Sequence, residues 1–187
     1  MKRSTVFWFA NVVGPLILVS YWRGVGAFED PSVYWGDVPT SMQSFIVPWM
    51  FVAATGYLMM FHRLFFAWTE AQVASLHWPW ATDDGRGVQR LMVLFAAFLL
   101  CSLVWIDLTR LYIEGPSTLG MVAIVAVLWI AGVASVGFAV LVWPARGRLQ
   151  GANVVVAGSV MLSIQCTWWD AIYWLSLIHI SEPTRPL

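Results

Sequence analysis

Three charged residues in an otherwise apolar segment have the spacing of one helical face. Asp107, Arg110 and Glu114 are three and four residues apart, so their side chains are neighbours on a helix. Counted from Leu91 at about 1.5 Å per residue, Asp107 lies about 24 Å into a hydrocarbon layer of about 30 Å. An ionisable group there costs roughly 2 to 3 kcal/mol and usually faces the bundle interior, water or a partner. The spacing favours an interfacial ladder that reaches the headgroups, and the alternative is a ligand or ion site.

A fourth ionisable residue, Asp170, belongs to the last apolar segment and reaches the same outer level. It ends a polar stripe at helical spacing, with Gln165 beside it, formed by Ser163, Cys166 and Thr167. Hydrogen bonds between membrane helices explain most such stripes without a function. The alternative is one outward-facing ligand site that attracts a cation or an amine. Its residues would be Asp107, Arg110, Glu114 and Asp170, beneath the acidic loop of Glu29, Asp30 and Asp37.

The remaining residues predict no metal, cofactor or known catalytic site. His62 and His77 each lack a second histidine at helical spacing, so paired haem ligation has no basis. Cys101 and Cys166 both fall inside apolar segments, which predicts packing rather than zinc binding or disulfides. The chain contains no GxSxG, HExxH, phosphate-binding glycine loop or DNA-binding pattern. We therefore expect no cofactor, no metal and no nucleic-acid partner.

The composition excludes an ordinary water-soluble enzyme. Of 187 residues, 60% are hydrophobic and 11% are charged, against about 45 to 50% apolar residues in soluble domains. The mean hydropathy is +0.74. Ten Lys and Arg balance ten Asp and Glu, which argues against an overall anionic partner. The lipid bilayer is the expected environment.

The elements that must position these residues are five apolar runs, each near the length of about 20 residues that crosses a bilayer as a helix. The first run could be a signal peptide cleaved after Ala27, but it is longer than the usual apolar region, so we expect a retained anchor. The fold class is therefore all-α, a polytopic membrane helix bundle with five transmembrane helices in a single domain over residues 1–174. The expected spans are 6–22, 45–63, 91–113, 119–143 and 152–174.

Basic and aromatic residues predict the orientation. Outside the last thirteen residues, one side carries seven Lys and Arg and the other side carries two, Arg23 and Arg110. The positive-inside rule then predicts a cytoplasmic N-terminus. Several of the thirteen tryptophans fall near the expected helix ends, as in membrane-interface belts. The segment from His77 to Trp80 predicts an interfacial aromatic loop or, alternatively, a docking segment.

The fourth run carries a surface of small residues. Ala131, Ser135 and Ala139 recur every four residues, which is the pattern that lets membrane helices approach closely. The neighbouring helix could belong to this chain or to a membrane-protein partner.

The last residues resemble translated laboratory DNA. The segment from Leu175 to Arg185 matches, in one reading frame, a transposon end and adapter used for sequencing libraries. Residues 175–187 are therefore interpreted as an artefactual tail and excluded from fold reasoning. His179, Glu182 and Arg185 are therefore not counted as candidate functional residues. The native residues that follow Trp174 are not given by this sequence.

Three functional hypotheses follow. Small size, a small-residue helix face and no catalytic motif favour an accessory or scaffold subunit of a membrane complex. The outer acidic and arginine cluster favours a transporter or receptor for a small cationic or polar ligand. A membrane-embedded enzyme that uses Asp107 or Asp170 as acid or base is the third hypothesis.

Overall fold

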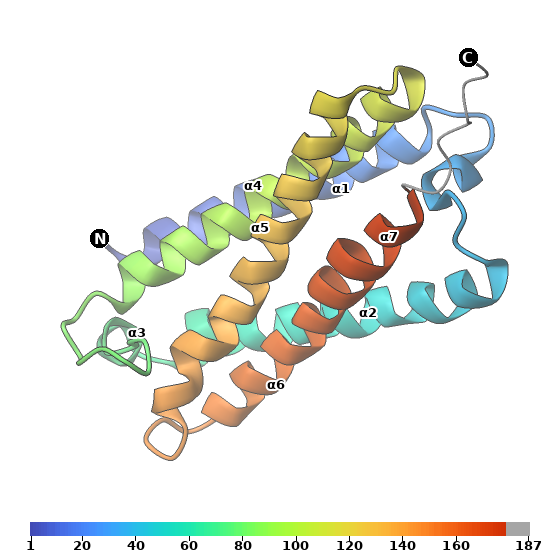
Figure 1. The fold of residues 1–187 in the computed structure, drawn as a ribbon. Coiled ribbons are helices and arrows are strands. Elements are labelled where there is room, and N and C mark those ends of the chain that lie inside the picture. The colour runs from blue at the N-terminus through green and yellow to red at the C-terminus, as the bar shows by residue number, and fades with distance from the viewer. Residues whose placement is uncertain (179–187) are drawn as a thin grey trace.

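A computed structural model describes residues 1–178 of the chain, and all regular secondary structure in this range is helical. Five helices are long and apolar enough to span a membrane, as the sequence predicts (Figure 1). They are α1 (Arg3–Val25), α2 (Thr40–His62) continued by the π-helix η2 (Arg63–Ala67), α4 (Gly87–Glu114), α5 (Thr118–Val142) followed by the short 3-10 helix η3 (Trp143–Ala145), and α6 (Ala152–Ser163) continued by the π-helix η4 (Ile164–Trp174) and by α7 (Leu175–Ile178).

The fifth helix does not end at Trp174. It continues through α7, where Leu175 is buried against the rest of the bundle. His179, Glu182 and Arg185 lie outside the described residues.

Two short helices lie in the polar segments that connect α1 to α2 and α2 to α4. A 3-10 helix, η1 (Pro31–Trp35), follows Asp30, whose carboxylate accepts hydrogen bonds from the backbone N–H and hydroxyl of Ser32. These bonds lower the pKa of Asp30 below its usual value. In the longer segment, α3 (Glu70–Ala74) begins at a capping box between Thr69 and Gln72, which satisfies two backbone N–H groups at the start of the helix.

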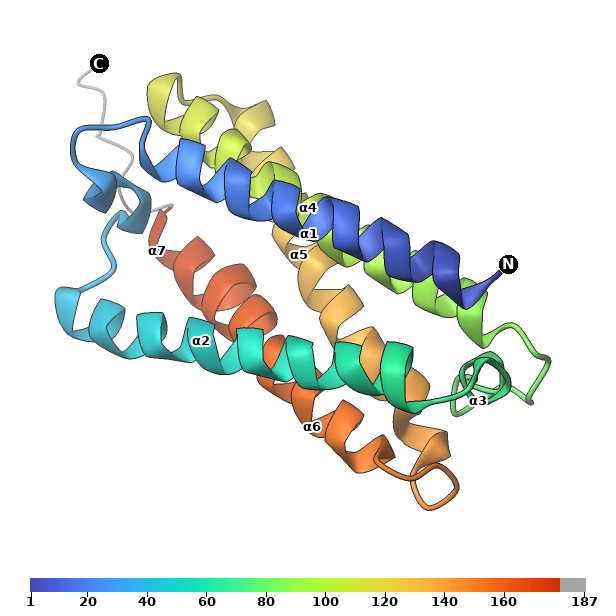
Figure 2. The ribbon, with the colours of Figure 1, turned by 180° about the vertical axis from the view of Figure 1, so that it is seen from behind.

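The long helices form an open arrangement in which α1 packs on α4, α4 on α5, α5 on α6 and α6 on α2. Figures 1 and 2 show the resulting pairs, with α1 beside α4 and α2 beside α6, while α5 crosses between them. The helices α1 and α2 therefore form the two edges of this arrangement. Buried aromatic rings fill its centre, where Phe95 contacts Phe138 at a centroid distance of 4.9 Å.

One end of the bundle holds the N-terminus and two loops. The Arg3 guanidinium donates to the carbonyl of Trp68, and the Trp68 indole donates to the carbonyl of Gln150 at 2.9 Å. Polar contacts therefore join the N-terminus to the loops that follow α2 and α5.

The turn before α4 is fixed by an ion pair at the same end. Asp84 pairs with Arg90 at 2.8 Å, and this guanidinium holds the pKa of the carboxyl below its usual range. Gly85 adopts a left-handed φ of 72°, and its N–H donates to Asp83. These contacts hold the turn that leads into α4.

Candidate functional site

The π-helix η4 creates a side-chain pair that an α-helix would separate. A π-helix closes its hydrogen bonds between residues five apart, and Gln165 and Asp170 are five residues apart. The Gln165 amide donates to Asp170 Oδ1 at 2.8 Å. Winding of this kind is frequent at functional sites, so the pair marks η4 as a candidate.

The predicted polar stripe is divided by this winding. Ser163 donates to the Ser159 carbonyl within its own helix at 2.7 Å, and Thr167 donates to the Gly132 carbonyl on α5 at 3.3 Å. Cys166 and Asp170 instead line a cavity. The stripe follows from α-helical spacing, which does not apply after Ser163.

We name this space the Asp170 cavity; it has a volume of about 210 Å³. Gln165 is only 5% exposed, and its Oε1 atom has no hydrogen-bond partner among the described residues. The second carboxylate oxygen of Asp170 also has no partner there. Buried polar atoms in proteins almost always have partners, so the Gln165 oxygen requires an explanation, whereas Asp170 is partly exposed. The other walls come from Tyr21 (α1); Met50, Ala53 and Ala54 (α2); Phe98, Cys101, Ser102 and Trp105 (α4); Leu128 and Ala131 (α5); and Leu162 and Cys166.

Two aromatic side chains close one side of the Asp170 cavity. The Trp105 indole donates to the Tyr21 hydroxyl, and the two rings meet edge to face at 5.7 Å. Because a phenol can donate as well as accept, the Tyr21 hydroxyl keeps its own proton for another acceptor. Tyr21, Trp105 and the pairing of Gln165 with Asp170 carry no signal in the sequence pattern that would mark them as site residues.

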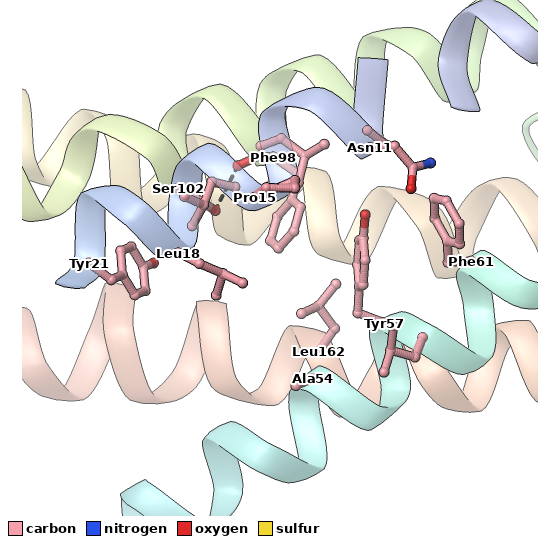
Figure 3. A pocket seen from close by; sticks show the side chains of 15 residues that line it. Asn11, Pro15, Leu18, Tyr21, Ala54, Tyr57, Phe61, Phe98, Ser102 and Leu162 are labelled. Carbon is pink, nitrogen blue, oxygen red and sulfur yellow. Dashed lines mark hydrogen bonds between the residues drawn. The ribbon is translucent and has the colours of Figure 1, made fainter. Parts of the chain in front are cut away.

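A larger space adjoins the Asp170 cavity between α1 and α2, and we name it the α1–α2 groove (Figure 3). Its volume is about 490 Å³, within the range of about 300 to 1,000 Å³ that is usual for ligand pockets. Leu18, Tyr57, Phe98 and Leu162 point toward one another across it. The groove and the cavity share Tyr21, Ala54, Phe98, Ser102 and Leu162.

Three of the four predicted site residues form a separate ladder at the end of α4. Arg110 lies 3.3 Å from Glu114 and 3.9 Å from Asp107. Their side chains are 31%, 45% and 37% exposed respectively. Asp107 also accepts a hydrogen bond from Ser20 on α1 at 3.2 Å.

Asp170 does not join this ladder. Among residues 1–178 no ion pair links Asp170 to Arg110. The structure thus places Asp107, Arg110 and Glu114 in one group and Asp170 with Gln165 in another.

The small-residue face of the fourth span is used largely within the chain. Ala131 and Ser135 are buried, whereas Ala139 is partly exposed. Gly132, beside them, lies against Cys166 and Thr167 of η4. These small residues therefore bring α5 close to the helix that carries Asp170.

The described part of the chain contains no group of three or more His, Cys, Asp or Glu residues that could hold a metal ion. Cys101 and Cys166 are free thiols. His77 lies at the N-terminal end of the bundle, 3.2 Å from the Arg148 guanidinium.

No family model, curated protein or solved structure matches this chain. The fold and the cavities define an all-helical protein with five helices that are suited to a membrane. Any finer function has to be argued from the chemistry of the Asp170 cavity.

Proposed function

We propose that this chain is a small multi-pass integral membrane protein that binds a small ligand in the Asp170 cavity, through hydrogen-bond donors or a positive charge on the ligand. The observation that carries the proposal is the buried Gln165 Oε1 atom, which has no donor among the described residues and belongs to the side chain that donates to the Asp170 carboxylate. Burying an acceptor without a donor is costly. A ligand that donates to Gln165 Oε1 would remove this cost, and the same ligand could pair with the Asp170 carboxylate.

The walls of the cavity support a cationic ligand. Asp170 is the charged side chain among the described residues that line it, and the rings of Tyr21 and Trp105 also line it. A cation is attracted to a carboxylate and also to an aromatic face. Of the four residues predicted for a ligand site, we place Asp170 in the proposed site. We interpret Asp107, Arg110 and Glu114 as an interfacial ladder.

The test measures thermal stability in lipid nanodiscs with n-butylammonium or, as the uncharged comparison, n-butanol. We expect butylammonium to raise the melting temperature of the wild type, and butanol to have little effect. Asp170→Asn should abolish the response, because the amide keeps the size of the side chain and removes the charge.

The matched control is Asp107→Asn, which removes an acid of the ladder and should leave the response intact. Equal responses in the wild type and in both variants would contradict the proposal. A response to butanol as large as that to butylammonium would contradict a cationic ligand.

An accessory or scaffold subunit is the second candidate, and an exposed aromatic pair supports it. Trp78 and Trp80 stack at 5.7 Å with nearly parallel rings, and Trp80 is 76% exposed. Tryptophan is enriched at the centres of protein interfaces. A partner that copurifies in stoichiometric amount and is lost in Trp80→Ala would support this function, while a single stable species without partners would argue against it.

Of the two acids named in the enzyme hypothesis, one lines a cavity. Asp170 is the acid that a bound substrate could reach there, whereas Asp107 lies in the ladder. This hypothesis stays a prediction of the sequence.

We also propose that the N-terminus is cytoplasmic. Supporting this, Lys2, Arg3 and the basic residues of two loops lie at one end of the bundle, where Arg3 contacts Trp68 and Arg148 contacts His77. In a chain without its native cysteines, Val33→Cys should react with an impermeant thiol reagent on intact cells. Gln150→Cys should react only after permeabilisation, and the reverse pattern would overturn the orientation.

A further inference from the structure

The Asp170 cavity and the α1–α2 groove together have the character of an amphiphile site. Gln165 and Asp170 line the cavity, and Gln165 Oε1 is buried without a hydrogen-bond partner among the described residues. The groove is walled mostly by apolar side chains, including Tyr57, Phe61 and Leu162. Because the two spaces share wall residues, one molecule can place a polar end in the first and an apolar end in the second.

The groove opens on the apolar surface of the bundle. Leu18 on α1 and Leu58 on α2 stand at its rim and are largely exposed. Gly14 and Pro15 form the adjoining part of α1, and a β-carbon at Gly14 would meet no atom within 4 Å. These residues lie in the middle of helices suited to span a membrane. In a bilayer, the opening would face lipid chains.

The chemistry of the polar end selects among amphiphiles. Gln165 and Asp170 offer acceptors, and a carboxylate ligand would meet the like charge of Asp170. A hydroxyl brings one proton to two acceptors, whereas a primary ammonium brings three donors and a charge. An amine therefore satisfies both oxygens.

We propose that the ligand is a lipophilic amine that enters sideways from the bilayer through the α1–α2 groove. Its ammonium group binds Asp170 and Gln165, and its apolar tail lies along Tyr57 and Phe61. This inference rests on the proposed ligand-binding function and adds the ligand class and the route of access.

Ala54 allows the groove to be separated from the cavity by mutation. It lines both spaces, and it is exposed rather than packed in the core. Ala54→Trp should place an indole at the junction and block passage of a tail. Thr55→Trp is the matched control, because Thr55 is the next residue, is exposed and lies outside both linings.

The experiment uses the full chain in nanodiscs of zwitterionic lipid and a dodecylamine with a photoreactive diazirine in its tail. We expect peptide mapping to find the label at residues 10–18 and 54–61. Excess dodecylamine should compete, while dodecanol and dodecanoate should not. Asp170→Asn and Ala54→Trp should each lower the labelling about tenfold, as expected for the loss of one charge-assisted contact or of the site. Thr55→Trp should leave it unchanged.

The outcomes separate this inference from the proposed function. If butylammonium stabilises the wild type but the diazirine labels all lipid-facing helices alike, the tail does not occupy the groove and this inference fails alone. An unchanged labelling pattern in Ala54→Trp has the same meaning. If no amine of any length stabilises the wild type, the proposed function fails and this inference fails with it.

Discussion

Gly56 on α2 and Gly158 on α6 lie in direct backbone contact. A β-carbon on Gly56 would lie 2.5 Å from the carbonyl oxygen of Gly158, and a β-carbon on Gly158 would meet Gly56 as closely. This approach fixes the spacing of the two helices that carry Ala54 and Leu162, which line both the groove and the cavity. The width of the proposed site therefore depends on the absence of a side chain at Gly56 and at Gly158.

Gly56→Ala and Gly158→Ala should each destabilise the protein, because the added methyl group meets backbone that cannot rotate away. Overpacking of this kind costs about 1 to 3 kcal/mol, which unfolding in mild detergent can measure. The control is Gly14→Ala, where the space is open and alanine favours the helix by up to about 1 kcal/mol. Unchanged stability in Gly56→Ala and Gly158→Ala would mean that the helices separate freely at this point.

Composition and periodicity predict the helical class and the five apolar spans, because lipid-facing backbone must satisfy its own hydrogen bonds. They do not predict the close contact between Gly56 and Gly158. The small residues at Ala131, Ser135 and Ala139 form a repeat that a sequence pattern can find, whereas Gly56 and Gly158 are single glycines in different helices. Their pairing depends on which helices become neighbours in space.

The candidate site was predictable only in part. Asp170 is recognisable because a carboxylate inside an apolar segment is rare. Its pairing with Gln165 requires π-helical winding over Ile164–Trp174, and no spacing rule for α-helices anticipates a pair five residues apart. Tyr21 and Trp105 come from two other helices, and they are ordinary aromatic residues until tertiary packing brings them to Asp170.

Leu175→Ala should destabilise the protein, although the residue belongs to the segment interpreted as an artefactual tail. Leu175 is 6% exposed and packs in the cluster that includes Val38, Ile46 and Trp174. Truncating a buried leucine costs about 2 to 5 kcal/mol, and a leucine packs in the same way whatever its origin. The melting temperature in detergent measures the effect, with exposed Ser176→Ala as the control. A neutral Leu175→Ala would instead support the expectation that the bundle is complete at Trp174.

Tyr34→Phe should destabilise the protein by about 0.5 to 1.5 kcal/mol, the usual net contribution of one hydrogen bond. The Tyr34 hydroxyl donates to the Gly24 carbonyl at 2.8 Å, and the Trp174 indole donates to the Tyr34 carbonyl at 2.9 Å. Tyr34 thus joins the loop after α1 to α1 itself and to η4.

The contribution of Tyr34 should also depend on pH. Burial raises the pKa of Tyr34 above its ordinary value of 10.0, so the folded state favours the neutral phenol. For a raised pKa, the stabilisation is complete below the ordinary pKa and is lost as the pH rises through the folded value. The stability difference between wild type and Tyr34→Phe should therefore be constant near neutral pH and shrink above pH 10. A difference that stays constant through the alkaline range would contradict this assignment.

Arg110→Ala and Glu114→Ala should have small and similar effects on stability. Arg110 lies between Asp107 and Glu114, and all three side chains are about a third to a half exposed. Pairs of this kind contribute about 0 to 1 kcal/mol, and salt screens them, so the effects should shrink further at high ionic strength. If Arg110 neutralised Asp170 inside the bundle, Arg110→Ala would cost roughly 3 to 5 kcal/mol, and adding Asp107→Asn and Asp170→Asn would recover part of the loss. That result would overturn the separation of the ladder from the Asp170 cavity. The Asp170 carboxylate would then pair with Arg110 and not with the proposed amine ligand.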